Sequence, residues 1–237
     1  MDLTEKTSNE NRHPWELSRA HCILNIVKKH DLTSVADIGA GDRFFASKLH
    51  GNVYAIDAGY EKSEIVDGIY CLNDISELPK LDEKSGVILM DVLEHIENDA
   101  DFLRQILDKT AKGTFVLITV PAFQFLFSEH DEFLKHHRRY NRKHLLSLLA
   151  SQNICVEKCR YFYTSLFFAR LAGLLFKKKK NEESVGIGAW RFSEKHLITR
   201  IIYSVLNIDF CLCSLFAKLH IYLPGLSLLA ICKSEKS

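Results

Sequence analysis

Short uninterrupted apolar runs, each bounded by polar or turn residues, recur along the chain. Runs of this length are typical of parallel strands that are buried on both faces. Stretches with the apolar spacing of helices lie before and between several of them. Strands that alternate with helices predict a doubly wound, mostly parallel α/β sheet. The predicted strands cover 35–39, 53–57, 69–74, 86–91, 114–121, 154–161 and 225–233.

The predicted helices complete this pattern. The first covers 14–30, where Pro14 occupies an initial position that suits proline. Asn141 is expected to cap a later helix. We therefore expect one domain over residues 1–237 with a seven-stranded sheet. The remaining predicted helices cover 44–49, 98–112 and 141–152.

Residues 162–224, between the last two predicted strands, form an apolar insertion with two helical stretches. The first stretch ends near a lysine run, and Arg200, Asp209 and Lys218 interrupt the second, so a simple transmembrane span is not expected. Two interpretations stay open. The helices pack on the sheet or on a second subunit, or they lie at the interface of an anionic membrane.

Four predicted strands carry an acid at or beside their carboxyl end. In an open parallel sheet these ends meet at one edge, where ligands bind. Carboxylates gathered there repel one another unless a ligand offers hydroxyls, amines or positive charge. Any one of them alone is also a common helix cap. The repeated pattern favours a ligand site formed by Asp37, Asp57, Asp74 and Asp91.

The first of these acids opens the turn DIGAG, residues 37–41. A dinucleotide fingerprint, G-x-G-x-x-G, would place a third glycine at position 44, where the chain has Phe44. A dehydrogenase is therefore disfavoured.

DIGAG and the ordered acids resemble class I S-adenosylmethionine-dependent methyltransferases, and MDVLEHI at 90–96 resembles their segment after the fourth strand. The resemblance implies a Rossmann-like fold and S-adenosyl-L-methionine as cofactor. It places Asp37 under the methionine end, Asp57 on the ribose hydroxyls, and Asp74 with Ile75 at the adenine. The cofactor-binding residues it implies are Trp15, Asp37, Gly39, Ala40, Gly41, Asp57, Ala58, Asp74, Ile75, Met90 and Asp91.

Arg43 departs from the family pattern, which commonly has glycine at this position. Its guanidinium either faces solvent at the start of a helix or meets the carboxylate of the cofactor. Both interpretations stay open.

HPWELSRA at 13–20 and the block 120–149 resemble a branch of bacterial methyltransferases often associated with cell-surface sugar or lipid biosynthesis. The resemblance implies that the block after the fifth strand forms the substrate wall. Phe123 is expected in an apolar lid. A basic cluster later in the same block would bind a phosphate or carboxylate of the substrate, with a solvated helix surface as the alternative. The residues of this cluster are His136, His137, Arg138, Arg139 and Tyr140, and Arg138, Arg139 and Tyr140 are the expected substrate-binding residues.

An oxygen or nitrogen nucleophile that carries a proton usually needs a base. His130 and His95 are the candidates, because imidazole titrates near neutrality. Asp131 is the candidate to orient His130, and packing against a neighbour is the alternative for His95. His130, Asp131 and His136 have no recognised ligand spacing, so no metal ion is expected.

The composition indicates which partners and which cellular compartment to expect. Lys and Arg number 31 against 30 Asp and Glu, so no global field indicates a nucleic-acid partner. Seven cysteines without a C-x-x-C pair are typical of reduced thiols in the cytoplasm, and the polar N-terminus has no signal-peptide pattern. We expect a cytoplasmic enzyme, either in peripheral contact with membrane through 162–224, with Trp190 near the interface, or a homodimer.

The expected function is methyl transfer to a small-molecule, glycan or lipid-linked acceptor, on oxygen more than on nitrogen. A catalytically inactive cofactor-binding partner or scaffold is the alternative, and Arg43 is the sequence feature that supports it.

Overall fold

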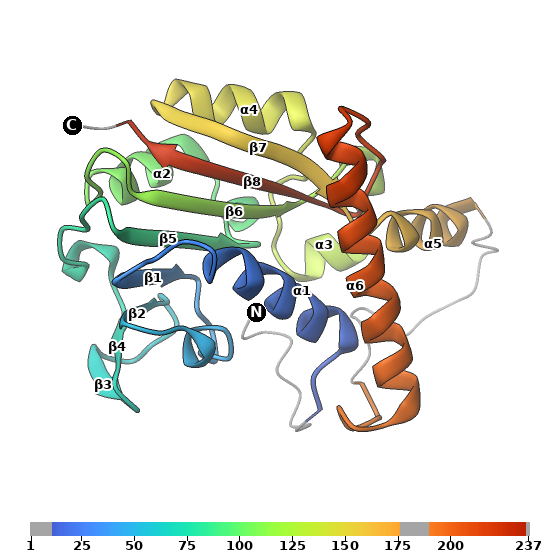
Figure 1. Ribbon diagram of the computed structural model, residues 1–237, viewed down its shortest axis with the longest axis horizontal. Helices are drawn as coiled ribbons and strands as arrows, with labels where there is room; N and C mark the ends of the chain where they lie inside the picture. The colour runs from blue at the N-terminus through green and yellow to red at the C-terminus, as the bar shows by residue number, and fades with distance from the viewer. Residues whose placement is uncertain (1–10, 176–189, 236–237) are drawn as a thin grey trace.

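The computed structural model describes residues 11–175 and 190–235, in which helices cover both faces of one sheet (Figure 1). The lysine run at 177–180 lies outside the described residues. The strands follow the order β3-β4-β2-β1-β5-β6-β8-β7 across the sheet. Their bounds are β1 Ser34–Ile38, β2 Asn52–Ile56, β3 Glu64–Val66, β4 Ile69–Leu72, β5 Ser85–Met90, β6 Phe115–Pro121, β7 Ile154–Phe162 and β8 Ser227–Ser234.

The centre of the sheet is parallel, as the buried runs predict. Strand β1 pairs in parallel with β2 and β5, β4 extends the parallel set beside β2, and β6 extends it beside β5. Strand β8 runs antiparallel between β6 and β7. The carboxyl ends of β1, β2, β4 and β5 therefore open on one edge of the sheet, as predicted.

Strand β3 is an eighth strand that the sequence analysis did not predict. It pairs antiparallel with β4 across a two-residue turn, in which Asp67 has φ 53° and Gly68 has φ 79°. Positive φ at both central residues is the geometry that matches the twist of a hairpin and favours Asp-Gly. Only three residues form β3, too few for alternation to be recognised.

Most helices lie where the pattern predicts them. The His13 side chain caps α1 by accepting the N–H of Trp15, and Asn141 caps α4 by accepting the N–H of His144. Helix α2 ends before its predicted boundary, because Thr110 forms a bridge with Leu81. The predicted helix 44–49 is only a 3-10 turn, Ala46–Lys48. The helix bounds are α1 Pro14–Val27, α2 Asp99–Leu107, α3 Glu129–Phe133, α4 Arg142–Ser151, α5 Thr164–Leu175 and α6 Leu197–Lys218.

Two apolar cores result. Helices α1 and α6 pack on one face of the sheet, and α2 and α4 pack on the other (Figure 1). The predicted insertion supplies α5 and α6, and α6 runs beside α1, where Ser18 Oγ donates to Asn207 Oδ1 at 2.9 Å.

Asp209 is a structural residue of the insertion. Its buried carboxylate accepts the N–H groups of Thr164 at 3.0 Å and Ser165 at 2.6 Å. It thereby caps the start of α5 and joins the two helices. The acid that interrupts the apolar pattern of α6 thus faces the protein rather than a membrane.

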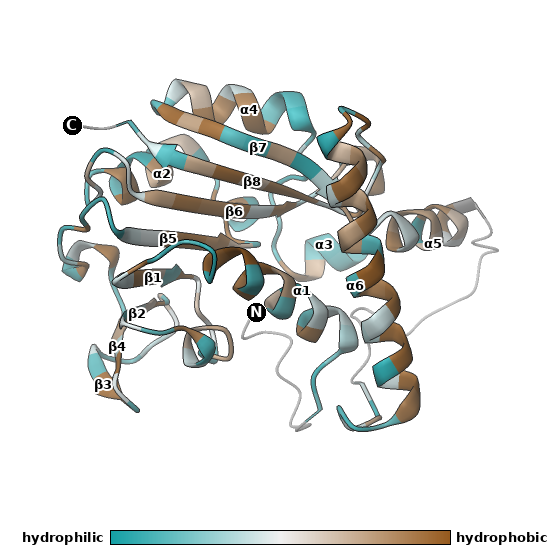
Figure 2. Ribbon diagram, in the orientation of Figure 1, coloured by the Kyte–Doolittle hydropathy of each residue, from teal (hydrophilic) through white to brown (hydrophobic). Residues whose placement is uncertain are grey.

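The outward face of α6 carries an apolar strip (Figure 2). By length and composition, α6 is the one helix in the described residues that could cross a membrane, and only 22% of its most apolar stretch is buried. Its inward face packs on the protein through Leu206, Phe210 and Cys213. We call the outward residues the α6 stripe: Leu197, Ile201, Val205, Ile208, Leu212 and Leu215, which are between 47% and 68% exposed.

Candidate active site

Two cavities lie side by side at the carboxyl edge of the parallel strands. The first, the strand-end cleft, has a volume of about 530 Å³ and is lined by the ends of β1, β2, β4 and β5. The second, the inner cavity, has a volume of about 330 Å³ and lies between α1, the turn after β5 and the segment after β6. Asp91 and His95 line both cavities.

The turn after β1 needs glycine for two reasons. Gly39 and Gly41 have φ 71° and 53°, in the left-handed region that glycine adopts without strain. A Cβ on Gly39 would lie 2.7 Å from Val92 Cγ2, so a side chain there would displace the Val92 side chain in the turn after β5. The two turns therefore approach one another closely at the floor of the strand-end cleft.

Arg43 has φ 66°, which explains why glycine is the common residue at this position. Its guanidinium donates to the thiol of Cys71 at 3.7 Å, on β4. Arg43 is absent from the lining of both cavities. This arrangement therefore does not support the interpretation in which Arg43 meets the carboxylate of a cofactor in the strand-end cleft.

Asp57 and Asp74 line the strand-end cleft with Ala58 and Ile75, as predicted. The Asp57 carboxylate accepts the N–H of Gly41 at 2.7 Å. Asp74 also caps a short turn by accepting the N–H of Ser76, and hydrogen bonds from Ser76 hold the pKa of Asp74 below its ordinary value. These hydrogen bonds leave both carboxylates at the wall of a cleft that suits hydroxyl and amine groups.

Asp37 lies beneath this floor, beside a small cavity that Ala40 and Met90 also line. Only 2% of Asp37 is exposed, and its Oδ2 has no hydrogen-bond partner in the described part of the chain. Burial and the nearby Asp57 raise the pKa of Asp37 to about 7. An unpartnered carboxyl group at this place fits a ligand that carries an ammonium group and hydroxyls.

Trp15, which the resemblance assigns to the cofactor, is absent from the lining of the strand-end cleft. It lines the inner cavity, and the guanidinium of Arg19 lies 4.1 Å from the centre of its ring. Arg19 is buried and forms an ion pair with Asp91, which also accepts a hydrogen bond from Thr119. The sequence analysis missed Arg19, although it is part of the motif HPWELSRA.

Asp131 is fully buried at the wall of the inner cavity. Its carboxylate accepts hydrogen bonds from Arg139 Nε at 2.8 Å and Nη2 at 3.1 Å, and its Oδ1 lies 2.9 Å from His136 Nδ1. Burial raises the pKa of Asp131, but these hydrogen bonds outweigh it and hold the pKa below its ordinary value. Asp131 therefore orients Arg139 and His136, whereas the sequence predicted that it would orient His130.

His130 lines the inner cavity and is half-buried. Burial lowers its pKa, so its imidazole is neutral at pH 7. The two predicted bases, His130 and His95, are thus brought to one cavity.

Three of the predicted substrate residues do not line the inner cavity. Arg138 pairs with Asp99 at 2.9 Å, and the buried Tyr140 hydroxyl donates to the same carboxylate at 2.7 Å. Phe123 stacks on Tyr161 with 4.7 Å between ring centres. These three residues hold the segment after β6 in place, whereas Arg139 lines the inner cavity.

Glu94 is a second residue that the sequence analysis missed. It is fully buried and lines the inner cavity, and burial raises its pKa to about 8. Within the described residues, neither of its carboxylate oxygens has a hydrogen-bond partner. The available signal was an acid within the apolar run MDVLEHI.

The family model described as a methyltransferase domain matches residues 12–172, more than half of the chain. A comparison with curated proteins gives no significant match.

Solved structures share the fold. An S-adenosylmethionine-dependent methyltransferase from Archaeoglobus fulgidus is 15% identical with a TM-score of 0.51, and the match covers 92% of this chain and 94% of that chain. The 4+2 cyclase SpnF is 13% identical with a TM-score of 0.55, over 97% and 85%. The phosphoethanolamine N-methyltransferase 2 of Haemonchus contortus, in complex with S-adenosyl-L-methionine, is 14% identical with a TM-score of 0.51, over 92% and 53%.

At such identities the structures establish the fold, and the domain match establishes the family. The strand-end cleft, with its glycine turn and three carboxyl groups, suits S-adenosylmethionine as the cofactor. The chain is therefore an S-adenosylmethionine-dependent methyltransferase and belongs to the methyltransferase domain family.

Proposed function

We propose that the enzyme methylates a hydroxyl group of an acceptor that binds in the inner cavity. The observation that supports this proposal is the junction of the two cavities. Asp91 and His95 line both, so a group in the inner cavity can reach a methyl donor in the strand-end cleft. Methyl transfer is mainly a problem of alignment and water exclusion, which such a junction serves.

The residues around the junction have different roles in binding and in proton transfer. Asp57 and Asp74 bind the hydroxyl and amine groups of the cofactor, and Asp37 binds its ammonium group. S-adenosylmethionine, when bound, supplies the methyl group from its sulfonium, and the electron pair of the broken C–S bond stays on sulfur. His130 accepts the proton of the acceptor hydroxyl at an imidazole nitrogen, as its lowered pKa allows.

The lining of the inner cavity suits an acceptor with an anionic and an apolar part. Arg139 and His13 offer N–H groups for hydrogen bonds to the anionic part, and Leu134, Leu166 and Leu226 offer an apolar wall. A lipid-linked sugar of the kind used in cell-surface biosynthesis has both parts. We therefore favour a lipid-linked acceptor over a soluble one.

The experiment that tests this function uses the whole protein with radiolabelled S-adenosylmethionine and a bacterial cell extract. Label that appears in the lipid-extractable fraction and withstands treatment with base, as a methyl ether does, supports the proposal. Label in the aqueous fraction alone contradicts a lipid-linked acceptor. Binding of the cofactor without any labelled product supports the alternative, a cofactor-binding protein without methyl transfer, and a related fold does occur in a protein described as a cyclase.

His130→Ala is expected to lower turnover by about 10²- to 10⁴-fold, because a positioned base contributes on this order. Its affinity for the cofactor, measured by calorimetry, should stay within about twofold of the wild type. His137→Ala is the matched control, since His137 is exposed and absent from the lining of both cavities. Near-normal turnover of His130→Ala between pH 6 and 8 would show that His130 is not the base.

A second part of the proposal concerns location. The enzyme would be cytoplasmic and bind the membrane surface through the α6 stripe, which is apolar, exposed and parallel to the helix axis. Trp190 is not part of this surface, because its Nε1 donates to Thr199 and its ring contacts His13. The stripe therefore carries the contact without help from Trp190.

Ile208→Asp is expected to weaken flotation with anionic liposomes by about tenfold or more, because burial of such a side chain contributes about 1.5–3 kcal/mol. Ile208 is 60% exposed. Ile65→Asp is the matched control, since Ile65 is 64% exposed and lies on β3, at the opposite edge of the sheet from β7, against which α6 packs. A wild-type protein that stays unbound and forms a stable dimer would mean that a second copy covers the stripe.

A further inference from the structure

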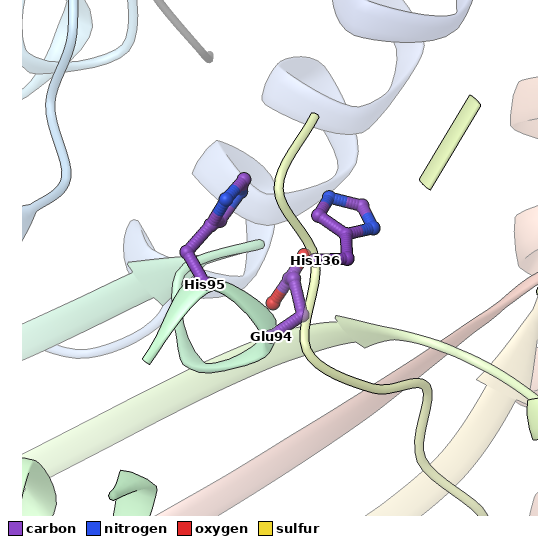
Figure 3. A group of neighbouring side chains, drawn as sticks. All are labelled: Glu94, His95 and His136. Atoms are coloured by element: carbon purple, nitrogen blue, oxygen red, sulfur yellow. The ribbon is translucent and has the colours of Figure 1, made fainter. Parts of the chain in front are cut away.

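Three potential metal ligands meet at the junction of the two cavities. Glu94 and His95 belong to the turn after β5, and His136 belongs to the segment after α3 (Figure 3). One ligand atom of each residue lies within 4.8 Å of the others. The two rings meet edge to face, with centres 4.6 Å apart. Two imidazoles and one carboxylate are a common ligand set for Zn²⁺ and related divalent metal ions.

Glu94 is the observation that points to a ligand. It is fully buried, and within the described residues both of its carboxylate oxygens are without a hydrogen-bond partner. A buried polar group without a partner is costly, so such a group in a cavity wall indicates a missing counterpart. One of these carboxylate oxygens lies within 4.8 Å of a ring nitrogen of each of the two imidazoles.

The nearby guanidinium groups do not supply this counterpart. Arg19 forms an ion pair with Asp91, and Arg139 binds Asp131 through two hydrogen bonds. Each of these two pairs is neutral by itself, so neither guanidinium is left to neutralise the carboxylate of Glu94 when it is ionised. A divalent cation would neutralise it at close range.

His136 is already oriented as a ligand. Its Nδ1 is hydrogen-bonded to Asp131 Oδ1 at 2.9 Å, and Asp131 is itself held by Arg139 and by the N–H of Ser128. A carboxylate on one imidazole nitrogen fixes the ring and its tautomer and leaves Nε2 for a metal ion. Metal-binding histidines usually have such a partner.

We propose that Glu94, His95 and His136 bind a divalent transition-metal ion of the Zn²⁺ class. Ligand atoms on one Zn²⁺ ion lie about 3.3 Å apart, so small side-chain rotations close the site. Three protein ligands leave at least one coordination position open toward the inner cavity. This revises the expectation of no metal, which considered His130, Asp131 and His136 and missed Glu94.

The site has a consequence for the reaction, and this consequence rests on the proposed function. An acceptor oxygen at the open position would lie at the junction of the two cavities. The cation would lower the pKa of the acceptor hydroxyl, and its proton would still pass to His130. The metal site itself requires neither a particular acceptor nor methyl transfer.

The test titrates the full-length metal-free protein with Co²⁺ and follows the visible d–d absorption. Zn²⁺ then competes for the same site, and the zinc content is measured after dialysis. We expect one ion for each chain, and at least about tenfold weaker Co²⁺ binding by Glu94→Gln and by His136→Ala. His137→Ala is the matched control and should bind as the wild type does, because the exposed His137 lies outside the cluster.

Three results would overturn the proposal. These are no d–d absorption in the wild type, equal binding by the wild type and both ligand variants, or sulfur-to-cobalt charge-transfer absorption, which would place the ion on a cysteine. Circular dichroism of each variant confirms that it is folded, and cofactor binding by calorimetry gives a second check. Metal binding is measured without cofactor or acceptor, so its failure is distinguishable from failure of methyl transfer.

Discussion

Asp131→Ala is expected to lower the free energy of unfolding by about 3–5 kcal/mol, since removal of one partner from a buried ion pair leaves the other charge uncompensated. Asp131 is fully buried, and Arg139, which binds it through two hydrogen bonds, is 8% exposed. The variant would also remove the hydrogen bond to His136 and the capping of the Ser128 N–H. Urea unfolding at pH 7 measures the difference.

Glu132→Ala is the control for this prediction. Glu132 is the next residue of the same short helix, it is exposed, and it is expected to change the free energy of unfolding by less than about 0.5 kcal/mol. A loss below about 1 kcal/mol in Asp131→Ala would mean that Arg139 reaches solvent or another acid once its partner is gone. The wall of the inner cavity would then be less rigid than its hydrogen bonds indicate.

Asp37→Asn is expected to stabilise the cofactor-free enzyme at pH 8 by on the order of 4 kcal/mol, since each unit of pKa difference corresponds to about 1.4 kcal/mol. The pKa of Asp37 is about 7 in the folded protein and 3.8 in its ordinary environment. Between these values the folded state binds the extra proton, so stability falls as the pH rises. The loss is absent below about pH 4 and complete above about pH 7.

The measurement is urea unfolding of the wild type and Asp37→Asn between pH 4 and 8. The difference between the two proteins should grow with pH, because asparagine has the shape of the acid but does not ionise. Asp67→Asn is the matched control, since Asp67 is exposed and its positive φ suits asparagine. A difference that stays constant with pH would show that Asp37 remains ionised in the folded protein.

The same variant should bind the cofactor more weakly, although it is more stable. The ammonium group would lose a charge-assisted hydrogen bond, which contributes about 1.5–3 kcal/mol. Stability and affinity are thus expected to change in opposite directions. This combination distinguishes a binding carboxyl group from one that serves only the fold.

The arrangement of the strands could be predicted from the sequence because it depends on local patterns. Apolar runs define the buried parallel strands, and the acid after each run marks the edge where Asp57 and Asp74 line the strand-end cleft. The eighth strand could not be predicted in the same way. Its three residues are too few for a pattern, and the Asp67-Gly68 turn was the signal.

The inner cavity was less predictable because it depends on contacts between distant segments. Arg19 on α1 meets Asp91 after β5, and Asp131 meets Arg139 across a loop. A charged residue in a helical pattern is usually exposed, so the buried position of Arg19 has no local signature. Partners such as these emerge only when the sheet has brought the segments together.

The position of β8 has a consequence for how the chain is made. This strand lies between β6 and β7, although it follows both in the sequence and comes after α5 and α6. Until it has been synthesised, β6 and β7 have no common partner, and the backbone groups on their facing edges are unpaired. Unpaired edges are prone to associate with other chains. The nascent enzyme therefore depends on β8, which is synthesised after both of its neighbours, for protection from aggregation.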